Sequence, residues 1–140
     1  MTSRRLLLIA GLFALWPLHS ADAAGRHYYS SWSYHPQRSY HYVQYYYKPE
    51  PTYTTYNYHY CIYYPSAPQY VYYYNPYSKH YWGRYDVKNK GYSLLAEADR
   101  KGSLKEIPES AFPAPGEMPT IPESADGERM PPPPAVPKKE

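Results

Sequence analysis

The chain has 140 residues and a formal net charge of +3, and 22 of its residues are tyrosine. This length allows one small domain. Its basic residues are too few and too scattered for the clustered Lys and Arg surface that nucleic-acid binding requires, so we expect no nucleic-acid partner.

The first 23 residues have the three parts of a secretory signal peptide. Arg4 and Arg5 form the charged start, Leu6–Trp16 is an apolar run, and small residues allow cleavage after Ala23. The apolar run is shorter than the roughly 20 residues that span a bilayer. We therefore predict an exported protein, located in the periplasm, the cell envelope or outside the cell, with no transmembrane segment after signal cleavage.

Residues 24–92 form a tyrosine-rich region that is poor in large aliphatic residues. All the tyrosines lie here, and the only large aliphatic residues from Gly25 to Tyr92 are Val43, Ile62, Val71 and Val87. A buried hydroxyl that is left without a partner costs about 1–3 kcal/mol. The composition therefore predicts a largely irregular, low-complexity chain or a tyrosine-rich surface, without a packed interior.

Three extended runs separated by prolines lie within about residues 39–74. They are Ser39–Tyr47, Thr52–Tyr64 and Gln69–Tyr74. The middle run alternates most clearly, which places His59 and Cys61 on the face opposite Tyr58 and Tyr60. The runs are compatible with a small antiparallel β meander, and a polyproline-like or disordered chain is the competing interpretation.

Residues 93–106 carry the helical signals of the chain. Ser93 can cap a helix over 93–101, Glu97 and Lys101 are spaced as an i, i+4 ion pair, and Gly102 suits the position after the helix end. Ser103 and Glu106 then fit a capping box. We predict one short helix here, followed by at most about one further turn before Pro108.

Residues 107–140 form a Pro-rich tail with an internal repeat. The sequence Ile107-Pro108-Glu109-Ser110-Ala111 returns as Ile121-Pro122-Glu123-Ser124-Ala125. Pro-rich composition predicts an extended, solvated and disordered tail. Such a tail serves either as a spacer or as a docking strip for a partner or the cell wall.

The stretch from Tyr81 to Pro134 resembles the C-terminal half of a group of exported, tyrosine-rich bacterial proteins. The WGRYD sequence at Trp82–Asp86 and the SLLAEADRKGSLK sequence that starts at Ser93 carry the resemblance. It implies a bacterial source and export, and it assigns no activity and no site residues.

No catalytic or cofactor motif is present in the sequence. There is no GxSxG, HExxH, CxxC or phosphate-binding glycine loop, so we expect no enzyme, no catalytic residues and no cofactor. His59 and Cys61 are weak candidates for binding copper or zinc, because imidazole and thiolate suit those ions. Two ligands fall short of the usual four of a structural site, and the alternative is that both are ordinary solvated side chains.

Cys61 is the single cysteine. A lone cysteine in an exported protein suggests an intermolecular disulfide or a free thiol. If Cys61 lay on an edge strand, it would meet its counterpart in a second copy. We therefore predict a disulfide-linked homodimer through Cys61, with a free thiol of no consequence as the alternative.

The sequence as a whole predicts a non-enzymatic structural or surface-interaction protein of a bacterial envelope. Its tyrosine rings offer faces for self-association or for a cell-wall surface. One alternative is a carbohydrate-binding module in which tyrosine rings stack on polysaccharide, and another is weak copper or zinc binding.

Overall fold

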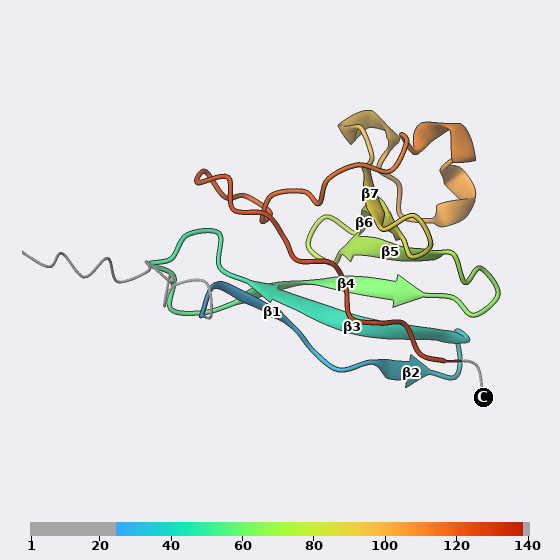
Figure 1. Ribbon diagram of the computed structural model, residues 1–140, viewed down its shortest axis with the longest axis horizontal. Helices are drawn as coiled ribbons and strands as arrows, with labels where there is room; N and C mark the ends of the chain where they lie inside the picture. Colours follow the sequence, from blue (N-terminus) through green and yellow to red (C-terminus); the bar gives the residue numbers. More distant parts are fainter. Residues whose placement is uncertain (1–24, 139–140) are drawn as a thin grey trace, which may run out of the picture.

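The structure, a computed structural model, describes residues 25–138, which contain one antiparallel sheet of seven strands (Figure 1). From β3 onward, each strand pairs with the next one along the chain, and β1 and β2 both pair with β3. The strands are β1 (His27–Tyr29), β2 (Ser33–His35), β3 (Tyr40–Tyr47), β4 (Asn57–Tyr63), β5 (Tyr70–Asn75), β6 (His80–Asp86) and β7 (Gly91–Leu94).

The expectation of a largely irregular, low-complexity chain is wrong. The meander predicted over about residues 39–74 is confirmed in part, because β3 and β4 fall within the first two extended runs and β5 overlaps the third, ending one residue later at Asn75. The sheet continues beyond it on both sides, through β1 and β2 at one edge and β6 and β7 at the other. Pairing with a neighbouring strand satisfies the backbone of these outer segments, whose own sequence carries only a weak strand signal.

Both edges of the sheet are short or occupied. β1 and β2 share one edge, pairing with opposite halves of β3, so this edge is interrupted between them. At the other edge, Tyr92 of β7 exchanges two backbone hydrogen bonds with Gly116, at N···O distances of 2.9 and 2.8 Å. Interrupted and covered edges offer little template for pairing with another chain.

One face of the sheet, here called the tail face, carries the larger core. Its fully buried side chains include those of Val43, Tyr45, Tyr47, Cys61, Val71 and Tyr73. Tyr92 packs across Gly83, where a Cβ atom would overlap the Tyr92 hydroxyl. Figure 1 shows the C-terminal segment, in orange to red, crossing the strands.

Tyrosine forms this core because most of the hydroxyls find partners. Tyr29 and Tyr73 join their hydroxyls at 2.9 Å, and the Tyr47 hydroxyl lies 3.0 Å from His59 Nε2. The hydroxyl of Tyr92 has no partner among the described residues. Satisfied hydroxyls remove most of the penalty on which the expectation of no packed interior depended.

The Pro-rich tail is not solvated along its length as expected. Ile121 and Met130 are buried against the tail face, with exposed fractions of 0% and 2%. The carbonyls of Pro131 and Ala135 accept hydrogen bonds from Tyr29 and the Trp32 indole. The extended conformation predicted from the prolines leaves backbone carbonyls free, and side chains of the N-terminal edge use them.

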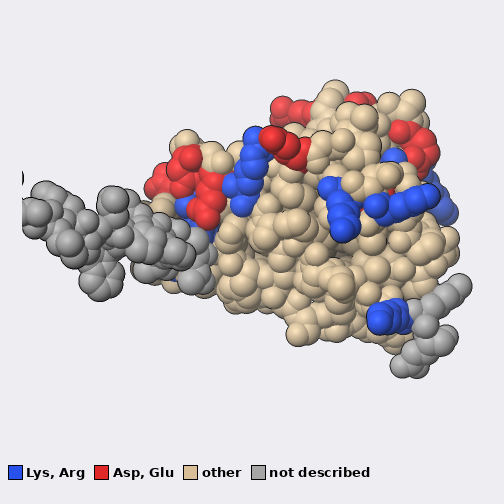
Figure 2. Space-filling view, viewed as in Figure 1, with Lys and Arg blue, Asp and Glu red and all other residues tan. Residues whose placement is uncertain are grey.

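Arg26 fastens the tail to the start of the sheet. Its guanidinium is 2% exposed and contacts Asp126 at 2.6 Å and Glu128 at 3.0 Å. It also donates to the carbonyls of Lys48 and Pro49. Figure 2 shows acidic and basic side chains gathered over this part of the tail.

The helix expected over 93–101 does not form. Ser93 belongs to β7, and the chain makes only single 3₁₀ turns at Glu97–Asp99, Leu104–Glu106 and Glu109–Ala111. A nine-residue helix is marginal alone, whereas the extended chain pairs with β6 and buries Leu95. Only the N-cap half of the capping box predicted at Ser103 and Glu106 is present: the Ser103 hydroxyl accepts from the Lys105 amide, and the turn ends before Pro108.

The predicted signal segment, residues 1–23 with cleavage after Ala23, lies outside the described residues. Within residues 25–138, no helix combines the length and the apolar character needed to cross a bilayer.

Candidate functional site

The second face of the sheet, here called the groove face, is only half covered. Over β5–β7, Leu95, Ile107 and Phe112 of the following segment pack against tyrosines of the sheet. Arg84 is held there between the rings of Tyr70 and Phe112, 3.7 and 3.9 Å from their centroids. The remainder of this face forms an open groove with a volume of about 640 Å³.

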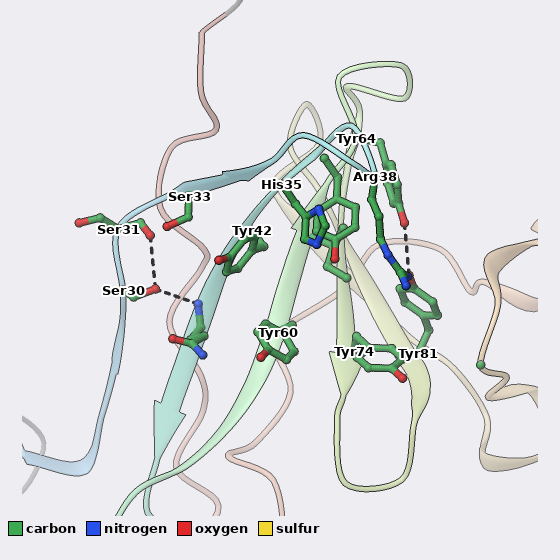
Figure 3. A pocket seen from close by; sticks show the side chains of 14 residues that line it. Ser30, Ser31, Ser33, His35, Arg38, Tyr42, Tyr60, Tyr64, Tyr74 and Tyr81 are labelled. Carbon is green, nitrogen blue, oxygen red and sulfur yellow. Dashed lines mark hydrogen bonds between the residues drawn. The ribbon is translucent and has the colours of Figure 1, made fainter.

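Alternation along the strands puts tyrosines on the floor of this groove. Residues two apart on a strand share a face, so each of β3, β4 and β5 supplies tyrosines at even-numbered positions. The floor residues are Tyr40, Tyr42, Gln44, Tyr60, Ile62, Tyr64, Tyr74 and Tyr81 (Figure 3). The groove therefore crosses four neighbouring strands.

The rings on the floor pack edge to face. Tyr42 lies at 80° to Tyr40 and at 75° to Tyr60, with centroid distances of 6.2 and 6.0 Å. This is a favourable aromatic geometry. Both Tyr42 and Tyr60 stay half-buried, so these rings are fixed by their neighbours and still accessible from the groove.

One wall of the groove is polar and comes from the N-terminal edge. Ser30, Ser31 and Ser33 lie along the link between β1 and β2, and His35 and Arg38 follow at the end of β2 and in the next turn (Figure 3). Ser30 is fixed in place by the Gln44 amide, which donates to its hydroxyl at 2.8 Å. Gly102 forms part of the opposite side.

Burial keeps the phenols of Tyr40 and Tyr81 neutral at ordinary pH. Burial raises the pKa of Tyr81, and its hydroxyl lies 3.4 Å from that of Tyr64. Burial also raises the pKa of Tyr40, while the charge of Arg38 acts in the opposite direction on the same phenol. Neutral phenols present ring faces and hydroxyls that both donate and accept hydrogen bonds.

The lining of the groove is made of neutral and basic residues. Among the described residues that line it, none is Asp, Glu or Cys, and His35 is the single histidine. General acid–base catalysis needs a proton donor and acceptor placed beside the reacting atoms. The chemistry that this lining offers is stacking, hydrogen bonding and a positive charge.

His59 and Cys61 lie side by side on β4 as predicted, but on the buried tail face. His59 is 3% exposed and Cys61 is fully buried. Burial lowers the pKa of His59 to about 3, and the ring is enclosed by Tyr47, Tyr77 and Trp82. Within residues 25–138 no third His, Cys, Asp or Glu joins them to complete a possible metal site. The interpretation of both as solvated side chains is wrong, and copper or zinc binding there stays a prediction without a supporting contact.

The edge position on which the predicted Cys61 disulfide depended is also wrong. Its strand β4 is paired on both sides, with β3 and β5. Burial raises the pKa of the thiol, which disfavours the thiolate that forms disulfides. The disulfide-linked homodimer stays a prediction, and it requires β4 to open first.

Sequence reasoning placed Tyr60 of the floor on a defined strand face but did not identify the polar wall. Alternation in the middle run placed Tyr58 and Tyr60 on one face before the fold was known. Ser30, Ser31, Ser33, His35 and Arg38 join the groove because β1 and β2 both fold back on β3. β2 forms a short hairpin with β3, while β1 pairs with the far half of β3, and the sequence analysis predicted neither strand.

In comparisons with known proteins, no family model, no curated protein and no solved structure matches this chain. The functional interpretation therefore depends on the geometry of the groove.

Proposed function

We propose that this protein is a non-enzymatic, exported protein of a bacterial cell envelope that binds an extended surface polymer through its tyrosine-lined groove. The observation that carries the proposal is the row of accessible, mutually braced rings across β3–β5. Rings held in place before binding lose little conformational entropy when a ligand stacks on them. An open groove also suits a chain that enters and leaves at its ends.

Polysaccharide is the polymer class that the lining favours. Sugar rings have apolar faces and hydroxyl edges, and aromatic side chains with polar tips complement both. The groove supplies ring faces from Tyr42 and Tyr60 and hydroxyl groups from Ser31 and Ser33. A protein partner or a second copy of the chain would instead be expected to need a larger and more continuous surface.

The first experiment measures retention of the purified protein on insoluble cell-wall glycan and on common insoluble polysaccharides. We expect the wild type to be retained on at least one glycan and the double variant Tyr42→Ala/Tyr60→Ala to lose retention. Tyr53→Ala is the matched control, because Tyr53 is 45% exposed in the β3–β4 loop and lies outside the groove.

Three outcomes would contradict the proposal. Retention of the double variant at the wild-type level would show that the groove is not the binding surface. Recovery of the chain only from the cytoplasm after cell fractionation would refute export. Loss of retention in all three proteins, with self-association intact, would favour self-assembly over glycan binding.

A further inference from the structure

The formal charge on the described lining of the tyrosine-lined groove is positive and comes from Arg38. Arg38 and His35 lie on its polar wall, and no carboxylate is among the described residues that line it. Ion pairs within the described residues use Arg26, His27, Arg84 and Arg129. Arg38 is therefore exposed at the groove without an acidic partner there.

The position of Arg38 is fixed by its turn. Its backbone amide donates to the carbonyl of His35 at 3.2 Å, which closes the link between β2 and β3. Arg38 lines the groove together with Tyr40, the first residue of β3. Figure 3 shows the Arg38 side chain extending over the groove beside His35 and Tyr81.

One further basic residue, Lys101, lies next to the lining residue Gly102 in the sequence. The Lys101 carbonyl accepts from the Tyr81 amide at 2.8 Å, which fixes Lys101 beside the lining residue Gly102. Lys101 is exposed. Among the described residues that line the groove, Arg38 thus supplies the formal positive charge and no residue supplies a carboxylate.

The His35 ring adds an unused polar atom at the Arg38 end. Its Nδ1 is buried and has no hydrogen-bond partner among the described residues, while the ring packs on Tyr40 at a centroid distance of 5.3 Å. Buried polar atoms are normally paired. The wall thus combines a free guanidinium, an unpaired imidazole nitrogen and serine hydroxyls.

We propose that the groove binds an acidic polysaccharide, with a sugar carboxylate on the Arg38 guanidinium and the sugar rings on Tyr42 and Tyr60. This inference rests on the proposed function and names its ligand class. Guanidinium and carboxylate match in shape and form paired hydrogen bonds. The tyrosine floor supplies the charge-independent part of the binding, and Arg38 supplies the preference for acid.

The test compares two ligands with the same sugar chain, one with free carboxylates and one with methyl-esterified carboxyl groups. The acidic ligand is a hexamer of galacturonate, and the neutral ligand is the same hexamer with its carboxylates methyl-esterified. Titration calorimetry at pH 7 measures both affinities at low and high salt. We expect the acidic hexamer to bind about fivefold more tightly at low salt, and this advantage to shrink as salt screens the pair.

Two charge-removing variants complete the test. Arg38→Gln should abolish the preference for the acidic hexamer and leave the affinity for the ester within about twofold. Lys88→Gln removes one exposed positive charge outside the groove and should keep the preference. Matching urea midpoints for the two variants and the wild type exclude misfolding.

The outcomes separate this inference from the proposed function. Equal binding of the two hexamers, or a preference that survives Arg38→Gln, overturns the acidic ligand while groove binding stands. Loss of binding to both hexamers in Tyr42→Ala supports the tyrosine floor in either case. Absence of wild-type binding to both hexamers and to every glycan in the retention assay overturns the proposed function itself.

Discussion

Ile107 and Ile121 hold the same position in the two copies of the repeated sequence, yet the fold buries them on opposite faces of one sheet. Ile107 packs with Tyr72 and Leu95 on the groove face, and Ile121 packs in the core of the tail face. The chain crosses the β7 edge between them at Gly116. The tail therefore clamps the sheet from both sides.

This clamp predicts that both isoleucines contribute to stability. Ile107→Ala and Ile121→Ala should each lower the free energy of unfolding by about 2–4 kcal/mol, because each leaves a cavity in a packed cluster. The two losses should add in the double variant, since the sheet separates the sites. Urea unfolding followed by tryptophan fluorescence measures the change. Leu94→Ala, at a site that is 46% exposed, is the control and should cost far less. An Ile121→Ala effect as small as the control would show that the tail is not packed in solution.

The buried contacts of Arg26 lead to a second stability prediction, in which another cation at this position does not replace the guanidinium. Arg26→Met should destabilise the protein by about 1–3 kcal/mol, because it leaves the carbonyls of Lys48 and Pro49 without their donor. The carboxylates of Asp126 and Glu128 are partly exposed, so water can replace their contacts to Arg26. Arg26→Lys should restore little, since an ammonium cannot reproduce the forked contacts. Limited proteolysis should then cleave the tail near residues 119–130 faster than in the wild type. Full rescue by Arg26→Lys would mean that a single charge contact is enough.

His59 predicts how stability changes with pH. Burial lowers its pKa from the ordinary value near 6.5 to about 3 in the folded protein. The unfolded chain binds the proton first, so this contribution is complete above about pH 6.5 and is lost as the pH falls toward 3. Between pH 7 and pH 5 we expect a loss of about 2 kcal/mol.

The variant His59→Gln isolates this contribution. It should reduce the pH dependence between 7 and 5, whatever it does to stability at pH 7, and leave the smaller part that comes from His27, whose pKa is also lowered by burial. His41→Gln, at a half-buried site, serves as the control and should keep the wild-type dependence. An unchanged slope in His59→Gln would show that another group titrates in this range. The lower limit of pH 5 avoids Asp126, whose pKa is lowered by its hydrogen bond to Arg26 and whose contribution is lost in stronger acid.

Because Cys61 is buried, we expect its thiol to react slowly in the folded protein. In the folded protein a disulfide-exchange reagent at pH 8 should react with it at least about a hundredfold more slowly than in denaturant, because the side chain is inaccessible and burial raises its pKa. Non-reducing gels of protein whose thiols are blocked at lysis test the disulfide-linked homodimer at the same time. A dimer band that Cys61→Ser abolishes would show that β4 opens before or during folding in the cell.

The sequence by itself determined the strand content of the middle of the chain and the side on which its tyrosines lie. Alternation in Thr52–Tyr64 is a local property, and β4 keeps it, with Tyr58 and Tyr60 on one face and His59 and Cys61 on the other. The prolines between the runs likewise marked the turns, because proline cannot continue a paired strand.

Only the tertiary structure decided which face is core and which is groove. Both faces of the sheet are rich in tyrosine, so hydrophobicity does not distinguish them, and composition suggested no interior at all. Hydrogen bonds between residues distant in sequence make one face a core. The hydroxyl of Tyr29 pairs with that of Tyr73, and the His59 ring pairs with the hydroxyl of Tyr47. The tail then covers the tail face and leaves the groove face partly open.

The same reason explains the polar wall of the groove and the missing helix. Arg38 reaches the groove through the short hairpin between β2 and β3, and the serines reach it through the pairing of β1 and β2 with β3. Ser93 joins β7 because β6 offers it backbone partners. Local propensity is worth less than about 1 kcal/mol per residue, and a neighbouring strand that satisfies the backbone and buries Leu95 outweighs it. The pairing of one strand with another depends on two stretches of the sequence together, so neither stretch predicts it by itself.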